Sequence, residues 1–292
     1  MTRDAQIDHR HVVFQGRPMT RRPGRTTGPL CAVRDGVPAA TGLERWILHA
    51  AGLDASAYRR QPLRRRLPAC LRAVMAGSPD EARHLIATYP ALLAPALGTL
   101  LLGVTEFFRD PDVFDAIERR ALPAWTGGDG PIRIWSAGCS SGAELYSVAM
   151  LLSRAGLLGR AGLLGTDCRA DAIEAARTAR YPRDAAAHVP PDLRNTCLQE
   201  NGEDVRPVAA VRARVTWKTA DLLHGVERGP WDLVLWRNGA IYLTPAAAAT
   251  TFRRLAWTLA PSGFLVVGRA ERPPRGLGLR PTARCVYQKV GS

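Results

Sequence analysis

A glycine-rich stretch with an acidic residue behind it is the part of the sequence best suited to binding chemistry. The segment 138–142 reads GCSSG, and Glu144 follows it. Glycines let the backbone take positive φ and let a ligand approach closely. No lysine follows the second glycine, so a P-loop is excluded, and the middle glycine of the dinucleotide fingerprint is missing. A carboxylate at Glu144 would repel phosphates, so the stretch favours a cationic ligand.

The residues on either side predict the elements that position this stretch. Alternation over 132–136 is typical of a short strand, and the apolar residues between 145 and 152 recur at helical spacing. A loop between a strand and a helix directs unpaired N–H groups of the helix toward a ligand. The ammonium and sulfonium groups of S-adenosylmethionine fit such a site, although a purely structural strand, turn and helix explains the pattern equally well.

Further polar residues follow other expected strands. Asp167 ends a predicted strand over 160–168, where its oxygens either accept ribose hydroxyls or cap the next helix. Asp221 ends another strand, and Arg237 and Asn238 follow a buried strand over 233–236. Polar residues past the carboxyl ends of parallel strands line the ligand crevice of an open α/β sheet. The order of elements therefore predicts an α/β protein with a doubly wound sheet, completed by a strand ending at Glu271 and an edge strand over 283–290.

Charge and cysteine content narrow the class of protein. Forty basic and 26 acidic residues give a net charge of +14, which favours acidic partners. The basic residues are not clustered with aromatics, so nucleic acid is not an expected partner. The six cysteines show no C-x-x-C pairing, so neither a metal site nor a disulfide framework is expected. Without a signal peptide or a membrane-spanning run, we expect a cytoplasmic protein with no membrane insertion.

The chain before residue 131 divides into three parts. Residues 1–42 form a basic arm that we expect to be flexible, and residues 43–104 read as a small all-helical domain. Residues 105–130 carry the segment FFRD and a helical run. Arginines give one helix of the helical domain a basic face, which is either simply solvated or a docking surface for an acidic partner. They are Arg59, Arg60, Arg64, Arg65, Arg66 and Arg72.

Blocks of sequence spread over roughly residues 45–288 resemble the CheR-type glutamate O-methyltransferases, which methylate chemotaxis receptors. The blocks are FFRD (107–110), WSAGCSSGAELYSVA (135–149), TD (166–167), ADLL (220–223), RNGAIYL (237–243) and G-x-x-E (268–271). The resemblance implies a helical N-terminal domain, a Rossmann-like methyltransferase domain over residues 131–292 and a small β insert at about 182–217.

Residue roles follow from this resemblance block by block. It implies that S-adenosylmethionine, released as S-adenosylhomocysteine, is held with Glu144 at its methionine part, Asp167 at the ribose and Asp221 beside the adenine. Arg109 and Tyr242 are implied to lie nearest the transferred methyl group. The full set of implied cofactor residues is Thr105, Ala137, Gly138, Cys139, Gly142, Glu144, Asp167, Asp221, Leu222, Arg237 and Asn238.

Methyl transfer to a carboxylate requires little acid–base catalysis by the protein. A glutamate acceptor has a reference pKa of about 4.3 and is already ionised at neutral pH, so no general base is needed. The motif blocks contain no histidine. Catalysis then depends on alignment and desolvation of the reactants. Orienting them lowers the activation free energy by about 7–11 kcal/mol in favourable cases. Arg109 suits this task because an arginine can bind both oxygens of a carboxylate, and Tyr242 can fix the acceptor or crowd the methyl group into line.

Three interpretations of the function stay open. The first is a protein-glutamate methyltransferase acting on a chemoreceptor-like helix, docked by the basic face at 59–72. The second is a related methyltransferase acting on a small-molecule carboxylate or amine, which the departures from the family at 143–145 and 239–240 favour. The third is a non-catalytic protein that binds the cofactor or its product, against which Arg109 and Tyr242 argue. The sequence names neither the acceptor nor the oligomeric state.

Overall fold

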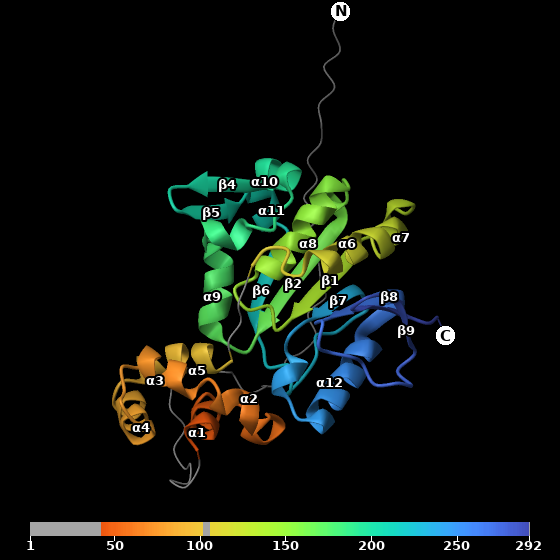
Figure 1. Cartoon of the computed structure of the whole chain (residues 1–292). Coiled ribbons are helices and arrows are strands. Elements are labelled where there is room, and N and C mark those ends of the chain that lie inside the picture. The colour runs from red at the N-terminus through yellow and green to blue at the C-terminus, as the bar shows by residue number, and fades with distance from the viewer. Residues whose placement is uncertain (1–41, 102–105, 292) are drawn as a thin grey trace, which may run out of the picture.

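The computed structural model describes residues 42–101 and 106–291. Within these ranges the chain forms two hydrophobic cores, one in the N-terminal helices and one around a large sheet (Figure 1). Of the arm predicted at residues 1–42, only Gly42 is among the described residues. Thr105, expected to contact the cofactor, also lies outside them.

Short helices packed around one core make up the helical region, residues 43–101. Ile47, Leu63 and Leu100 are buried in this core, because apolar residues recur at helical spacing and turn one face of each helix inward. The elements are α1 (Leu43–Ala50), η1 (Ala55–Ala57), α2 (Arg60–Arg64), α3 (Leu67–Ala73), α4 (Pro79–Thr88), η2 (Pro90–Leu92) and α5 (Leu93–Leu100).

The prediction that one helix carries the basic face at 59–72 is wrong. α2 ends at Arg64 and α3 begins at Leu67, so Arg65 and Arg66 lie between two helices. Pro68 in the first turn of α3 explains the break, because proline has no N–H to continue a preceding helix but fits a helix start. The arginines exposed to solvent are Arg59, Arg60, Arg64, Arg65 and Arg72, and Arg66 is half-buried.

The large sheet has the strand order β6-β2-β1-β7-β8-β10-β9. The first five strands in this order run parallel, and β10 pairs antiparallel with both of its neighbours. This is the Rossmann-like, doubly wound α/β sheet that the sequence predicts. The strands are β1 (Ile132–Ala137), β2 (Ala161–Asp167), β6 (Val215–Thr219), β7 (Trp231–Trp236), β8 (Leu259–Val267), β9 (Leu279–Ala283) and β10 (Val286–Lys289).

Helices cover the faces of this sheet. α8 (Ala143–Arg154) packs on β1 and β2, α9 (Ala170–Thr178) on β2 and β6, and α12 (Pro245–Thr258) on β8. α6 (Pro111–Arg120) and α7 (Pro123–Thr126) precede β1 in the chain. In the view of Figure 1, α6 and α8 lie above the sheet and α12 lies below it.

Three strand predictions need correction. The segment 283–290 is expected at an edge, but β10 lies between β8 and β9, and β9 is the edge strand. β9 gives no sequence signal because it contains Pro281 and has no buried face. β8 ends at Val267, so Glu271 lies beyond the strand that the sequence assigns to it. The strand predicted to end at Asp221 begins only at Val215, after the short helix α11 (Ala209–Arg212), and ends at Thr219.

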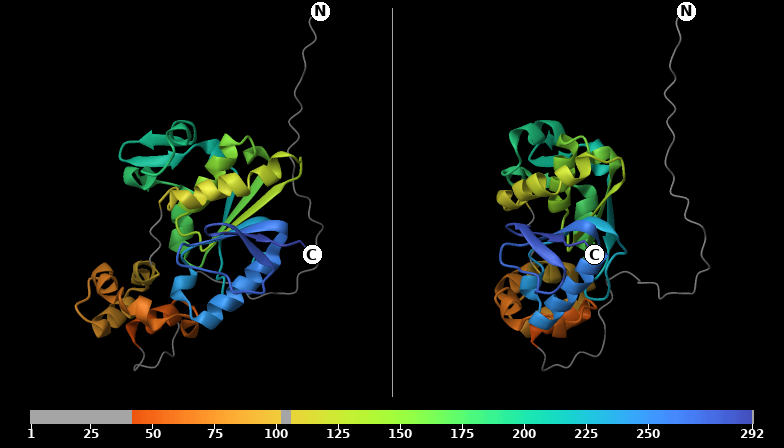
Figure 2. Two further views of the ribbon diagram at one scale, coloured as in Figure 1. Left: turned by 45° about the vertical axis from the view of Figure 1, so that its right-hand side comes forward. Right: turned by 90° about the vertical axis from the view of Figure 1, so that its right-hand side faces the viewer.

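A small antiparallel sheet with the strand order β3-β5-β4 forms a separate lobe. It comprises β3 (Tyr181–Pro182), η4 (Arg183–Ala186), α10 (Pro191–Cys197), β4 (Leu198–Asn201) and β5 (Asp204–Pro207). The last residues of the insert expected at 182–217 belong instead to β6 of the large sheet. Figure 2 shows this lobe at the top and the helical region at the bottom of both views. No helix among the described residues is long and apolar enough to cross a membrane.

Candidate active site

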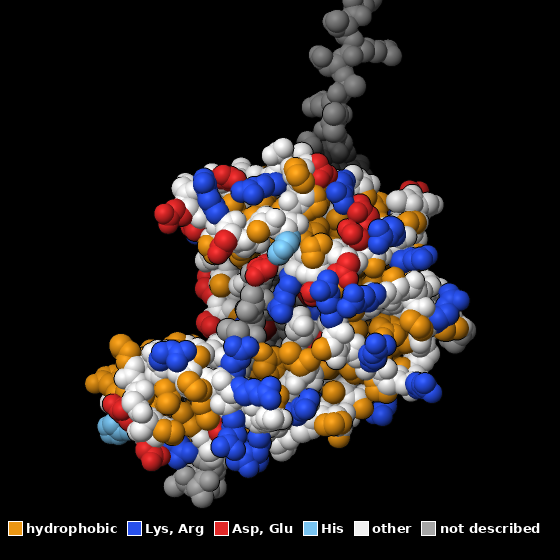
Figure 3. Space-filling view, in the orientation of Figure 1, with side chains coloured by type: hydrophobic (Ala, Val, Ile, Leu, Met, Phe, Trp, Pro, Cys, Tyr) orange, Lys and Arg blue, Asp and Glu red, His pale blue; other side chains and the backbone are white. Residues whose placement is uncertain are grey.

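A pocket opens where the carboxyl ends of β1, β2, β6 and β7 meet the helical region. Most of its wall comes from the loops that follow these strands, and Tyr58 and Leu101 of the helical region complete it. Figure 3 shows the hollow between the two regions, with Lys and Arg side chains on both sides of it. This is the crevice in which open α/β sheets bind ligands.

Most of the site residues expected from the sequence line this pocket. They are Arg109, Gly138, Cys139, Glu144, Asp167, Asp221, Leu222, Arg237, Asn238 and Tyr242. Ala137 and Gly142 do not: Ala137 is buried at the end of β1, and a Cβ on Gly142 would collide with the indole of Trp217. Gly142 has φ +88°, so glycine is required there by the backbone and by the core behind it rather than by a ligand.

The loop after β1 is held open by backbone hydrogen bonds. The N–H groups of Gly138 and Cys139 donate to Thr166 O over 2.7 and 2.9 Å. Gly138 has φ +70°, and a Cβ placed on it would meet no atom within 4 Å. The space above Gly138 is therefore open for a ligand that approaches the backbone.

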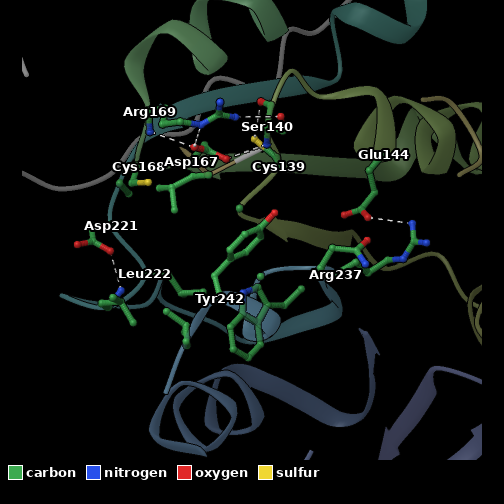
Figure 4. A pocket seen from close by; sticks show the side chains of 18 of the residues that line it. Cys139, Ser140, Glu144, Asp167, Cys168, Arg169, Asp221, Leu222, Arg237 and Tyr242 are labelled. Carbon is green, nitrogen blue, oxygen red and sulfur yellow. Dashed lines mark hydrogen bonds and ion pairs between the residues drawn. The ribbon is translucent and has the colours of Figure 1, made fainter. Parts of the chain in front are cut away.

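Asp167 joins this loop to the end of β2 (Figure 4). Its carboxylate accepts hydrogen bonds from Ser140 N over 2.9 Å and from Arg169 N over 3.0 Å. Arg169 also donates from Nε to Asp167 over 3.4 Å and from Nη2 to the Ser140 hydroxyl over 3.0 Å. The alternative that Asp167 is a solvent-facing cap of α9 is wrong, because the N-cap residue is Arg169, no side chain caps that helix and Asp167 is buried. The Asp167 side chain lines the pocket instead.

Arg237 is the centre of a buried ionic network at the opposite wall. Its Nη1 donates to Glu144 over 3.1 Å, and its Nη2 donates to Asp110 over 2.7 Å and to Arg109 O over 2.8 Å. The side chain is 2 % exposed. Its Nε has no hydrogen-bond partner among the described residues. Arg237 therefore fixes the backbone at Arg109 and orients Glu144, two tasks that its position in the sequence does not reveal.

Arg109 and Tyr242 reach the pocket from distant parts of the chain. Phe107 and Phe108 are buried in the core and anchor the segment, so Arg109 is held at the pocket wall. Phe108 and Asp110 both take positive φ, at 54° and 60°, an uncommon conformation that the surrounding contacts must maintain. Tyr242 ends the turn η5 (Ala240–Tyr242), and its ring points into the pocket (Figure 4).

Asp221 and the two pocket cysteines complete the wall near β6. The Asp221 carboxylate accepts from Leu223 N over 2.9 Å and lies 2.6 Å from His224 Nδ1. Burial raises the pKa of the Cys139 and Cys168 thiols well above their ordinary value. No cluster of His, Cys, Asp or Glu in the described ranges could hold a metal ion.

Several pocket residues were not expected from the sequence. Ser140 and Arg169 stand next to motif residues, so the glycine-rich stretch and Asp167 could have pointed to them. Tyr58 has no such signal, because only the fold brings it to the pocket. Arg59 N donates to Tyr242 O and Thr244 N donates to Ala57 O, both over 2.8 Å, so a backbone bridge joins the helical region to η5. Burial raises the pKa of the Tyr58 hydroxyl above its ordinary value.

The pocket has the chemical groups that S-adenosylmethionine requires. Open space over Gly138 admits the ligand to the backbone, and Glu144 supplies negative charge for its cationic end. The carboxylates of Asp167 and Asp221 stand at the ends of adjacent strands, where they can accept hydrogen bonds from hydroxyl and amino groups. The donor set therefore fits this cofactor.

Comparison with known proteins agrees with the geometry. Residues 103–277 match the family model described as CheR methyltransferase, SAM binding domain. The chain is 27% identical over 242 residues to a chemotaxis protein methyltransferase of Listeria monocytogenes, which covers 82% of this chain and 92% of that protein. It is 28% identical over 209 residues to one of Vibrio parahaemolyticus, covering 69% of this chain and 72% of that protein.

A third relative is named for a different process, biofilm formation. The chain is 30% identical over 235 residues to the probable biofilm formation methyltransferase WspC of Pseudomonas aeruginosa, covering 78% of this chain and 56% of that protein. The family match spans more than half of the chain and includes the loop after β1, Asp167, Arg237 and Tyr242. The chain therefore belongs to the CheR methyltransferase family, and S-adenosylmethionine is its cofactor.

Proposed function

We propose that this protein transfers a methyl group from S-adenosylmethionine to the side-chain carboxylate of a glutamate in a chemoreceptor-like protein. The observation that carries the proposal is that Arg109 and Tyr242 line the same pocket as the loop after β1 and Glu144. A guanidinium beside the cofactor site suits an anionic acceptor. The names of the Listeria and Vibrio relatives, chemotaxis protein methyltransferases, support an acceptor in a signalling protein.

The protein's part in this chemistry is to bind, orient and exclude water. The cofactor supplies an electrophilic methyl group on its sulfonium. Asp167 and Asp221 would hold its ribose and adenine, and Glu144 would face its methionine part. Arg109 would hold both oxygens of the acceptor carboxylate, which needs no deprotonation at neutral pH. The described pocket lining contains no histidine, which agrees with a reaction that has no general base.

The basic surface of the helical region supports an acidic protein partner. Arg59, Arg64, Arg65 and Arg72 are exposed, whereas Arg60 lies 3.6 Å from the buried carboxylate of Glu44. We propose that these arginines, with Arg60 and Arg66, dock an acidic receptor helix, and that residues 43–104 act as a substrate-recognition domain beside the methyltransferase domain of residues 131–292. Electrostatic attraction of this kind mainly accelerates association.

A small-molecule acceptor is the second candidate. Gly239 lies against Trp236, since a Cβ on Gly239 would be 2.5 Å from Trp236 Nε1, and both residues line the pocket. Gly239 and Ala240 stand where the resemblance to the family implies bulkier apolar residues, and this departure favours an altered acceptor side.

One labelling experiment separates the two candidates. The purified protein is incubated with S-adenosylmethionine labelled in its methyl group and a lysate of the source cells. Label on protein that base releases as methanol supports glutamate methylation. Label on a small molecule contradicts it and favours the second candidate. The Arg109→Ala variant serves as the control for transfer by other methyltransferases in the lysate.

A further inference from the structure

The block G-x-x-E at 268–271 has no role in the site described so far. Glu271 lies beyond the end of β8 and is 5 % exposed. Its Oε2 accepts hydrogen bonds from the N–H groups of Gly268 and Asn238, each over 2.8 Å. Its Oε1 accepts from Ala240 N over 2.7 Å and from Ile241 N over 3.3 Å. Each carboxylate oxygen therefore receives two backbone donors.

Three of these donors belong to the segment that carries two pocket residues. We call residues 238–242 the β7 loop, because they follow β7 directly. Asn238 and Tyr242 both line the pocket, and Asn238 takes the left-handed conformation with φ +60°. Such a backbone needs outside support, which Glu271 provides.

The fit between Glu271 and the β7 loop is close. A Cβ on Gly268 would lie 2.7 Å from Glu271 Oε2 and 2.9 Å from Asn238 N. The far end of the loop is held separately, by the hydrogen bond from Arg59 N to Tyr242 O. Glu271 thus fixes the start and middle of the β7 loop, and the helical region fixes its end.

We propose that Glu271 is a positioning residue for methyl transfer, which acts by holding the β7 loop so that Asn238 and Tyr242 face the pocket. The proposal rests on the proposed function where it assigns Tyr242 to the transfer step. The four N–H donors require a carboxylate, because only this group accepts hydrogen bonds at both of its oxygens. In glutamine an NH₂ group, which is a donor, replaces one of the two oxygens. The two backbone N–H groups that this oxygen bound would lose their acceptor, so that part of the β7 loop would be released.

The test compares Glu271→Gln with a matched control, Asp232→Asn. Asp232 also accepts a backbone hydrogen bond, from Arg133 N over 2.8 Å, but it stands near the start of β7, away from the pocket. We expect Glu271→Gln to lower kcat by about 10–100-fold, since misplaced catalytic groups cost rates of this order. The control should retain kcat within about twofold even where its melting temperature falls. Equal kcat in Glu271→Gln and wild type would overturn the proposal.

A double-mutant cycle separates positioning from general destabilisation. If Glu271 acts through Tyr242, the loss of kcat caused by Glu271→Gln should shrink to less than about threefold in a Tyr242→Phe background, because the two residues are coupled. The same fold-loss in both backgrounds would contradict the proposal. If Glu271→Gln does not fold, Gly268→Ala replaces it in the cycle, since its added methyl group displaces the loop from the same side.

A binding measurement keeps this proposal distinct from the proposed function. If the wild type methylates no acceptor, the proposed function fails, but affinity for S-adenosylhomocysteine still reports on Asn238. Calorimetry should then show affinity about tenfold weaker in Glu271→Gln and unchanged in Asp232→Asn. Equal affinities in the wild type and Glu271→Gln would overturn the role of Glu271.

Discussion

Arg237 and Glu144 face each other across the carboxyl ends of β7 and β1. The guanidinium donates to one carboxylate oxygen over 3.1 Å, and the Ser136 hydroxyl donates to the other over 3.0 Å. Arg237 also pairs with Asp110, whose other carboxylate oxygen lies 3.2 Å from Arg269 Nε, so the two acids are paired with two arginines. The position of the Glu144 carboxylate at the pocket wall is therefore fixed by Arg237 and Ser136.

Replacing Arg237 with lysine should destabilise the protein and weaken cofactor binding. Lysine keeps the positive charge, but its single ammonium group cannot replace the guanidinium, whose two NH₂ groups donate to Glu144, Asp110 and Arg109 O. We expect a loss of about 1.5–3 kcal/mol in the free energy of unfolding, measured by denaturant titration. Arg154→Lys is the control, because Arg154 pairs with Glu118 and Asp192 at the surface and should cost at most about 1 kcal/mol. Equal stability losses in the two variants would argue against a special role for Arg237.

Removing the Arg109 side chain should abolish most turnover while leaving cofactor affinity intact. The guanidinium is assigned to the acceptor, so Arg109→Ala should lower kcat by about 100-fold, a loss typical of a misaligned reactant. Steady-state kinetics and calorimetry with S-adenosylhomocysteine measure the two quantities. Arg119→Ala, which removes an exposed arginine of α6, controls for the loss of positive charge. Unchanged turnover would remove Arg109 from the mechanism.

Substitution of Asp167 by asparagine should instead act on cofactor affinity. Asparagine cannot accept from Ser140 N and Arg169 N with two oxygens, so the substitution should disturb both the loop after β1 and the proposed contact with the ribose. We expect affinity for S-adenosylhomocysteine to fall by about 10–100-fold, which corresponds to the loss of a hydrogen bond to a charged group. Asp171→Asn, at an exposed position in the first turn of α9, should have no effect. Calorimetry that finds the same affinity in both variants would refute the assignment.

The backbone bridge to the helical region can be cut with one substitution. Arg59 has φ −75° and ψ 129°, values that proline adopts, and Tyr58 before it is extended. Arg59→Pro thus deletes the N–H that donates to Tyr242 O with little strain. A typical hydrogen bond contributes about 0.5–1.5 kcal/mol, so its loss should lower kcat by about two- to tenfold. Arg59→Ala keeps the N–H and should keep kcat, while the loss of an arginine proposed to dock the acceptor should raise KM. An equal fall in kcat in Arg59→Ala and Arg59→Pro would contradict the role of the bridge.

The pocket thiols should resist alkylation in the folded protein. Burial raises the pKa of Cys139 and Cys168 above the ordinary value of 9.0, and only the thiolate reacts. Because a higher pKa means less thiolate at any pH below it, iodoacetamide labelling should stay slow up to mildly alkaline pH. Mass spectrometry after labelling, with denatured protein as the reference, measures this. Rapid native labelling of Cys139 would show that the loop after β1 opens in solution.

The sequence predicts the parts of the fold whose pattern is local. β1 and β7 are recognised because buried apolar residues end abruptly in small or polar ones, and α8 because Leu145, Val148 and Leu152 share helical spacing. β9 is missed because an edge strand with Pro281 needs no apolar alternation. The break between α2 and α3 is missed because arginine is a good helix former and hides it.

In the candidate site, too, the sequence predicts the residues that belong to a local pattern and misses those that do not. Motif residues next to strand ends, such as Gly138 and Asp167, are predicted because parallel strands place their carboxyl ends at the same edge of a sheet. The buried partners of Arg237 and the three β7-loop amides at Glu271 are not predicted, since these contacts join residues far apart in the chain. Tyr58 belongs to the same class: its neighbour Leu243 is chosen by packing between regions, not by any local pattern.

The bridge at Tyr58 and Leu243 means that the cofactor-binding part of the chain is not self-sufficient. The family match begins at residue 103, yet one wall of the pocket comes from residues before it. A truncated sheet region would retain the strand-end carboxylates and the contacts of Glu271, but the Tyr242 end of the β7 loop would lose the hydrogen bond from Arg59 N. Exchanging the N-terminal helices between relatives would therefore change the geometry at Tyr242.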